Sequence, residues 1–93
     1  MTRKQIDDFV DEYYPDEKIL LADGFDDAFL GIAPRMNQSP VAVYDRQRCV
    51  EVLVERDGMT WEEADEFVSY NVEGAFVGEG TPLYLQRPVT ESR

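Results

Sequence analysis

The clearest structural signals of the chain lie between Val41 and Ala64, which bound the sequence VAVYDRQRCVEVLVERDGMTWEEA. The run Val41–Tyr44 is short, apolar and contains β-branched residues, and this pattern predicts a strand. Asp45 follows it directly, and aspartate is a residue type that caps the N-terminus of a helix. Gly58 stands where a glycine in the left-handed conformation closes such a helix. The sequence therefore predicts a strand that leads straight into a helix.

A second helix is predicted directly after the first. Thr60 and Glu63 fit a capping box, in which each side chain accepts a hydrogen bond from the backbone N–H of the other residue. Gly74 is expected to end this helix. The turn between the two helices is short, which predicts a helical hairpin. The inner face of the second helix is predicted to consist of Ala64, Phe67, Val68, Asn71 and Val72.

The residues before this unit predict a helix and a β-hairpin. Thr2 and Gln5 fit another capping box, and Pro15 is expected to end the helix that begins there. The apolar runs 19–22 and 28–33 flank an Asp-Gly pair, which is typical of two strands joined by a hairpin turn. Residues 34–40 are predicted to form a loop, because proline, asparagine and serine are concentrated there.

Together these elements predict a single acidic α+β domain over residues 1–86, with residues 87–93 as a polar C-terminal tail. Residues 82–85 supply the last strand, and its leading proline suits a sheet edge. The expected order is α-β-β-β-α-α-β, with a small, mostly antiparallel sheet of three to four strands and helices packed on it. Apolar side chains of the predicted hairpin point to both sheet faces, so a second chain is one way to cover the sheet.

The charge of the chain is segregated. The net charge is −11, from 20 acidic and 9 basic residues. Residues 1–27 hold nine acids and three bases, whereas residues 57–79 hold seven acids and no base. Binding to nucleic acid or to an anionic membrane requires basic residues, so both kinds of partner are disfavoured. The charge instead favours a partner with a basic surface, although solubility is an alternative explanation.

The residue types present argue against catalysis. The chain contains no histidine, which removes the most versatile general base and a common metal ligand. Its single cysteine, Cys49, falls within an apolar helix stripe, where a buried structural role is expected. No phosphate-binding loop is present. We therefore expect neither an enzyme nor a bound cofactor. The sequence also shows neither a signal peptide nor a membrane span, so a cytoplasmic protein is expected.

Two acidic groups are the candidate binding sites. Glu62, Glu66 and Glu73 follow one stripe of the predicted second helix with Asp65 beside it, and these four residues are the first candidate for partner binding. Glu62 and Glu66 are expected to lie about 6 Å apart along the axis. This distance is close to the phosphate spacing of one DNA strand, so a nucleic-acid mimic is one interpretation; a solvated helix face is the other.

The second candidate is the loop from Asp23 to Asp27. Its three carboxylates could bind Ca²⁺ or Mg²⁺, although the spacing is not that of an EF-hand. The alternative is a turn in which aspartate side chains bind nearby backbone N–H groups. Phe25 either contacts a partner from the loop tip or folds back into the core. The residues assigned to partner binding here are Asp23, Phe25, Asp26 and Asp27, and no metal site is assigned.

Four stretches form a combined pattern: ADGFDDAFLG at 22–31, VYD at 43–45, DGMTWEEA at 57–64 and NVEGAFVGEGTP at 71–82. With this pattern, about residues 19–85 resemble a family of small uncharacterised proteins that are encoded by bacteriophages and occur in some bacterial genomes. The resemblance implies a phage-type accessory protein in the host cytoplasm, and it assigns no catalytic or binding residue.

The expected function is therefore non-catalytic binding to a basic surface of a host protein, as an inhibitor or a nucleic-acid mimic. One alternative is a small metal- or ligand-binding module at the loop Asp23–Asp27. The other is a homo-oligomeric structural protein, such as a homodimer.

Overall fold

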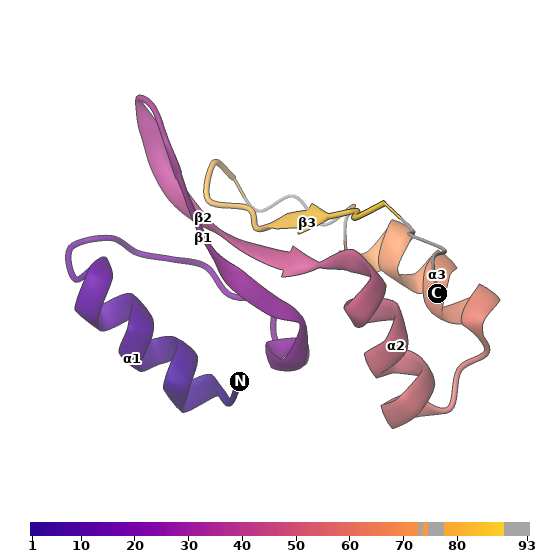
Figure 1. Ribbon diagram of the computed structural model, residues 1–93. Helices are drawn as coiled ribbons and strands as arrows, with labels where there is room; N and C mark the ends of the chain where they lie inside the picture. The colour runs from indigo at the N-terminus through magenta and orange to yellow at the C-terminus, as the bar shows by residue number, and fades with distance from the viewer. Residues whose placement is uncertain (73, 75–77, 89–93) are drawn as a thin grey trace.

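The computed structural model describes residues 1–72, 74 and 78–88 (Figure 1). They form an α+β fold, which confirms the predicted class. The order α-β-β-α-α-β lacks one strand of the prediction. The helices are α1 (Arg3–Tyr13), α2 (Arg46–Asp57) and α3 (Trp61–Phe67), with a 3₁₀ turn η1 (Asp26–Ala28) and a π-helical segment η2 (Val68–Val72). The strands are β1 (Phe29–Arg35), β2 (Gln38–Asp45) and β3 (Leu83–Leu85).

The sheet has the strand order β1-β2-β3 and is mixed. β1 and β2 form an antiparallel hairpin, in which Phe29 pairs with Tyr44 and Ala33 pairs with Val41. β3 adds in parallel to the end of β2, where Tyr84 pairs with Tyr44. Parallel strands need a long crossover connection, and α2, α3 and η2 lie in the chain between β2 and β3. The antiparallel pairing of β1 with β2 is longer than the parallel pairing of β2 with β3, which agrees with the predicted, mostly antiparallel sheet.

The predicted strand at residues 19–22 is wrong. This segment runs alongside the core without joining the sheet, and the backbone N–H of Ala22 donates to the Tyr44 hydroxyl at 2.8 Å instead of to a neighbouring strand. The hairpin turn lies at Met36 and Asn37, so the predicted turn at the Asp-Gly pair is wrong. Of the predicted loop 34–40 only these two residues form the turn, because residues 34–35 extend β1 and residues 38–40 extend β2. Asn37 has φ 61°, a left-handed conformation that asparagine tolerates in such a turn.

The core lies between the sheet and the helices, centred on Tyr44, whose side chain is 0% exposed. A row of aromatic rings crosses it: Phe9 of α1 meets Phe29 at 6.4 Å, Phe29 meets Tyr44 at 5.7 Å, and Tyr44 stacks on Tyr84 at 5.7 Å between centroids. Cys49 is buried, as predicted. The residues on the Tyr44 side of β2 therefore anchor both the N-terminal helix and the helical hairpin.

The helices are short elements at the periphery of this core. α1 lies at one end of the molecule and α3 at the other, in a body with principal extents of 40 × 29 × 24 Å (Figure 1). Among the described residues, no helix combines the length and the apolar character needed to cross a bilayer. Arg87, at the start of the predicted tail, reaches back to the carboxylate of Asp45 that caps α2.

Candidate partner-binding site

The first candidate site is built on α3, whose start follows from local hydrogen bonds. The backbone N–H of Thr60 donates to the Glu63 carboxylate at 2.9 Å, and the N–H of Glu63 donates to the Thr60 hydroxyl at 3.1 Å. These bonds confirm the predicted capping box. The helix begins at Trp61, whose ring is more than half exposed. The cap therefore fixes the residue at which α3 begins, and the helical repeat then sets which face carries the acidic residues.

The inner face of this helix is narrower than predicted. Ala64, Val68 and Val72 are buried, as expected, but Phe67 is 37% exposed and Asn71 is exposed. For Asn71 the physical reason is the π-helical segment that starts at Val68, because its wider turn rotates Asn71 further from the buried Val68 than an α-helix would. Phe67 is the last residue of α3 and lies at the edge of the buried face. The predictions for Phe67 and Asn71 were therefore wrong.

Arg46 holds this wider turn in place. Its guanidinium, only 14% exposed, crosses from the first position of α2 to the Asp65 carboxylate at 2.8 Å and to the Ser69 hydroxyl at 2.8 Å. Asp65 belongs to the predicted partner-binding set, but its charge is already matched by this bond. We therefore assign Asp65 a structural role at the junction of α2 and α3.

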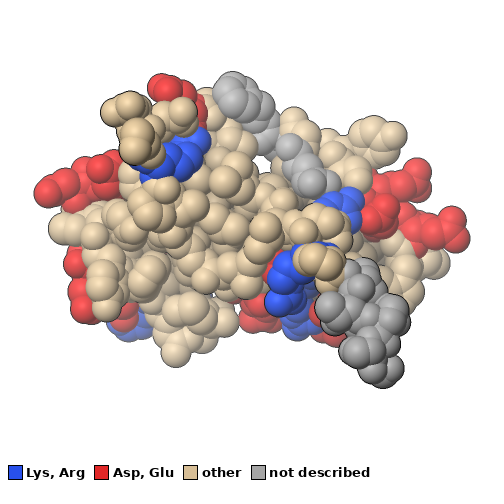
Figure 2. Space-filling view, turned by 45° about the horizontal axis from the view of Figure 1, so that its top comes forward, with Lys and Arg blue, Asp and Glu red and all other residues tan. Residues whose placement is uncertain are grey.

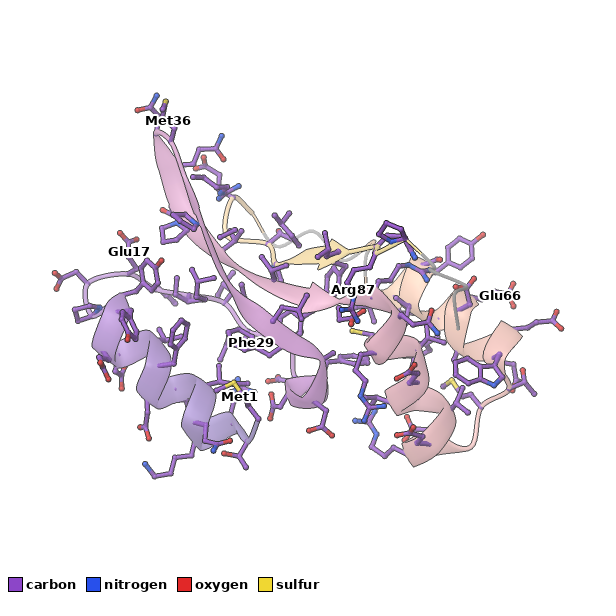
Figure 3. All side chains as sticks on the ribbon, in the orientation of Figure 1. Met1, Glu17, Phe29, Met36, Glu66 and Arg87 are labelled. Atoms are coloured by element: carbon purple, nitrogen blue, oxygen red, sulfur yellow. The ribbon has the colours of Figure 1, made fainter. Side chains whose placement is uncertain are left out.

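An open groove of about 430 Å³ lies along α3 and η2. Tyr70, 76% exposed, and Phe67 supply its aromatic wall, and Glu66 supplies an acidic edge. Figure 3 shows Glu66 on the outer side of α3, away from the sheet. Hereafter, "α3 groove" means the groove lined by Met59, Glu63, Glu66, Phe67, Tyr70 and Asn71.

The acids of α3 differ in how far their charge is matched. Glu62 and Glu66 form neither an ion pair nor a hydrogen bond with any residue that the structure describes. Glu73, the remaining member of the predicted set, lies outside the described residues. The structure thus places Glu66 with the exposed side chains of Phe67 and Tyr70. Sequence reasoning missed Phe67 as a surface residue because it shares the helical spacing of core positions, and it made no prediction for Tyr70.

In the second candidate site, the loop Asp23–Asp27, part of the acidic charge is compensated, whereas Asp23 and Asp27 remain exposed. Arg3 of α1 approaches Asp23 at 3.2 Å and Asp26 at 3.5 Å, so a guanidinium already lies beside these carboxylates. Phe25 is 7% exposed and packs in the core, which selects the second of its two predicted alternatives. No group of three or more metal-ligating side chains occurs within residues 1–72, 74 and 78–88.

A larger groove of about 650 Å³ lies between the N-terminus of α1, η1 and α2, and its charges are of both signs. Arg56 donates to the Gly24 carbonyl at 2.7 Å and to Asp57 at 2.9 Å, and its hydrogen bond lowers the pKa of the Asp57 carboxyl. Arg48 binds Glu55 at 3.2 Å. Because its cations and anions pair with each other or with the backbone, this groove favours neither a basic nor an acidic partner.

The acidic residues of α1 and α3 do not form one surface. In Figure 2, red acidic side chains gather at the left and right ends of the molecule, and the visible centre is mostly uncharged. The α1 end carries its own bases, for example Lys4, which binds Asp8 at 3.0 Å. The sequence has no base between Gly58 and Gln86. The α3 end is therefore the end at which acidic charge is least compensated.

Comparison with known proteins adds no family to these observations. No family model matches the chain, and neither a curated protein nor a solved structure matches it. The surface of α3 and η2 and the charge distribution are therefore the features that bear on function.

Proposed function

We propose that the protein is a non-catalytic, phage-type accessory protein that binds a basic surface of a host protein through α3 and η2. The observation that carries this proposal is the position of Glu66, a carboxylate without a described cationic partner, in a groove lined by the exposed rings of Phe67 and Tyr70. Glu62, likewise without a described partner, and the exposed Trp61 belong to the same helix. The resemblance to a phage family supports a partner in the host cytoplasm.

Solubility alone accounts for exposed carboxylates, but it does not account for exposed aromatic rings among them. A protein that only needed to stay dissolved would gain nothing from exposing Trp61 and Tyr70 at its most acidic end. Tryptophan and tyrosine are enriched at the energetically dominant positions of protein interfaces. Exposed aromatic rings together with unpaired carboxylates therefore favour binding to a partner protein, and not solubility alone, as the role of this surface.

The charge distribution also suggests how the partner is reached. Uncompensated charge at one end of an elongated molecule produces a directional field, which accelerates encounter with a basic surface. Salt screens exposed charges over about 10 Å at 0.1 M, so association should slow as salt is raised. A partner whose basic surface serves nucleic-acid binding would be inhibited by simple occupation of that surface.

The test compares two variants with the same net charge. Glu62→Gln/Glu66→Gln removes two charges at the α3 end, and Asp11→Asn/Glu12→Gln removes two exposed charges from α1 at the opposite end. Immobilised full-length proteins are used to capture partners from host lysate at low and high salt, with identification by mass spectrometry. We expect the wild type and the α1 variant to capture a basic partner, and the Glu62→Gln/Glu66→Gln variant to lose this capture. Equal recovery on both variants would show that net charge, not the α3 surface, is responsible.

A homodimeric structural role is a second candidate, favoured by the sheet face opposite Tyr44. Leu30, Leu83 and Leu85 are each 47% exposed, and Leu83 and Leu85 lie on that face of β3. Exposed apolar side chains that gather on one face are typical of an interaction site, and a second copy of the chain would cover them. Light scattering tests it: a dimer doubles the monomer mass of 10.7 kDa, and Leu83→Glu/Leu85→Glu should restore the monomer.

A further inference from the structure

We propose that the α3 groove receives an arginine side chain of the partner. This inference rests on the proposed function and adds to it the chemical group that the site recognises. Three features of the groove support it: its open shape, its carboxylates with unpaired oxygens, and the absence of a base among the described residues that line it.

The aromatic wall is suited to a flat cation. Tyr70 exposes 76% of its surface and Phe67 exposes 37%, and both line the groove. A cation over the face of an aromatic ring is attracted by the negative potential of the ring. The groove is open instead of deep, so a planar group can lie along its wall without burial of the whole side chain. Guanidinium is planar and stacks on rings, whereas the ammonium of lysine is a compact, strongly hydrated charge.

The acidic edge has carboxylate oxygens available for such a group. Glu66 makes no hydrogen bond or ion pair with a described residue. Glu63 accepts the Thr60 N–H through one oxygen at 2.9 Å, and its other oxygen has no partner in the described part of the chain. An arginine can donate two parallel hydrogen bonds to a single carboxylate, which adds orientation to charge attraction. Glu66 can therefore hold the guanidinium while the rings cover its face.

The protein's own cations do not fill this position. No lysine or arginine is among the described residues that line the groove. Arg46, a base that contacts α3 and η2, donates hydrogen bonds to Asp65 and Ser69 at 2.8 Å each. This differs from the loop Asp23–Asp27, where Arg3 already occupies the space beside the carboxylates. The groove thus pairs unmatched negative charge with an aromatic surface, and arginine is the residue that complements both.

The first test uses small probes on the full-length protein. Acetyl-Gly-Arg-Gly-amide is titrated to millimolar concentrations and followed by the NMR signals of the Tyr70 and Phe67 rings. The matched probe contains citrulline, which keeps the shape of arginine but has no charge. We expect saturable shifts confined to the groove with the arginine probe, weaker binding of a lysine probe and no saturation with citrulline. Equal binding of the arginine and citrulline probes, or no binding of either, would overturn the inference.

The second test uses variants. Tyr70→Ala should weaken the arginine probe about two- to fivefold, the effect of losing an exposed cation–π contact. Tyr13→Ala, which removes an exposed aromatic ring from α1, is the control and should leave probe binding unchanged. If both variants bind the probe like the wild type, the groove is not the arginine site. If Glu62→Gln/Glu66→Gln abolishes partner capture while the arginine probe fails to bind, the proposed function stands and this inference fails.

Discussion

Replacement of Tyr44 by phenylalanine tests how the fold is held together. Tyr44 is 0% exposed, and its hydroxyl accepts the backbone N–H of Ala22 at 2.8 Å. This bond fastens the segment before η1 to the centre of the sheet. Tyr44→Phe keeps the ring, and therefore its packing on Phe29 and Tyr84, but it leaves the N–H of Ala22 without its acceptor.

The expected loss follows from that unpaired donor. Leaving a buried polar group without its partner costs about 1–3 kcal/mol. Ala22 is partly buried, so water can offset some of this cost, and we expect the free energy of unfolding to fall by about 1–2 kcal/mol. For a domain of this size, the corresponding decrease in the melting temperature is about 4–10 °C.

The same variant should change the response to high pH. Burial raises the pKa of the Tyr44 hydroxyl above its ordinary value of about 10. The folded protein therefore holds this proton more tightly than the unfolded chain. The resulting stabilisation is complete below pH about 10 and is lost as the pH rises through the raised pKa. Tyr44→Phe lacks this contribution, so the stability difference between wild type and variant should shrink in alkaline solution.

Circular dichroism during heating, together with urea denaturation at neutral and alkaline pH, measures both effects. Tyr13→Phe is the control, because Tyr13 is largely exposed on α1 and its hydroxyl makes no hydrogen bond with a described residue. A Tyr44→Phe melting temperature within about 1 °C of the wild type would refute the reasoning. A stability difference that grows in alkaline solution would refute the assigned direction of the pKa shift.

Three further predictions concern the helices and the aspartate loop. Arg46→Gln should lower the free energy of unfolding by about 1–3 kcal/mol in urea denaturation, because charge-assisted bonds to Asp65 and Ser69 are lost; an unchanged midpoint would contradict the role given to Arg46. Thr60→Ala should cost about 1 kcal/mol, measured in the same way, because it removes the side-chain cap of α3; full stability would show that the cap is dispensable. Calorimetric titration with Ca²⁺ or Mg²⁺ should give no binding heat at the loop Asp23–Asp27, since Arg3 lies beside its carboxylates; saturable binding would revive the cation site.

The helix starts and the end of α2 could be predicted because their causes are local, whereas the change from α3 to the π-helical η2 at Val68 was not predicted. A cap joins residues three positions apart, so the spacing of Thr2 with Gln5 and of Thr60 with Glu63 was enough to locate two helix starts. Gly58 closes α2 with φ 71°, as a glycine at that position predicts. The strand that leads into α2 was also evident, because its apolar run ends directly at the capping Asp45.

The partners of the apolar runs could not be predicted in the same way. Residues 19–22 have a composition typical of a strand, but the N–H of Ala22 bonds to the hydroxyl of Tyr44, 22 positions further along the chain. The contact between η2 and α2 is likewise distant in sequence, because Arg46 bonds to Ser69, 23 positions further along the chain. Hydrophobic periodicity assumes regular helices and strands, so it assigned Phe67 and Asn71 to the core.

Composition alone established that the chain is acidic and that it lacks histidine, because these are counts that folding cannot change. The arrangement of the charge was decided by tertiary packing. Folding pairs Asp23 with Arg3 and Asp65 with Arg46 and places α1 and α3 at opposite ends. It leaves Glu66 beside the exposed rings of Phe67 and Tyr70 with no cationic partner among the described residues. The physical reason is that attraction between charges depends on their distance in space, and residues about 20 positions apart in sequence become neighbours only when the core forms.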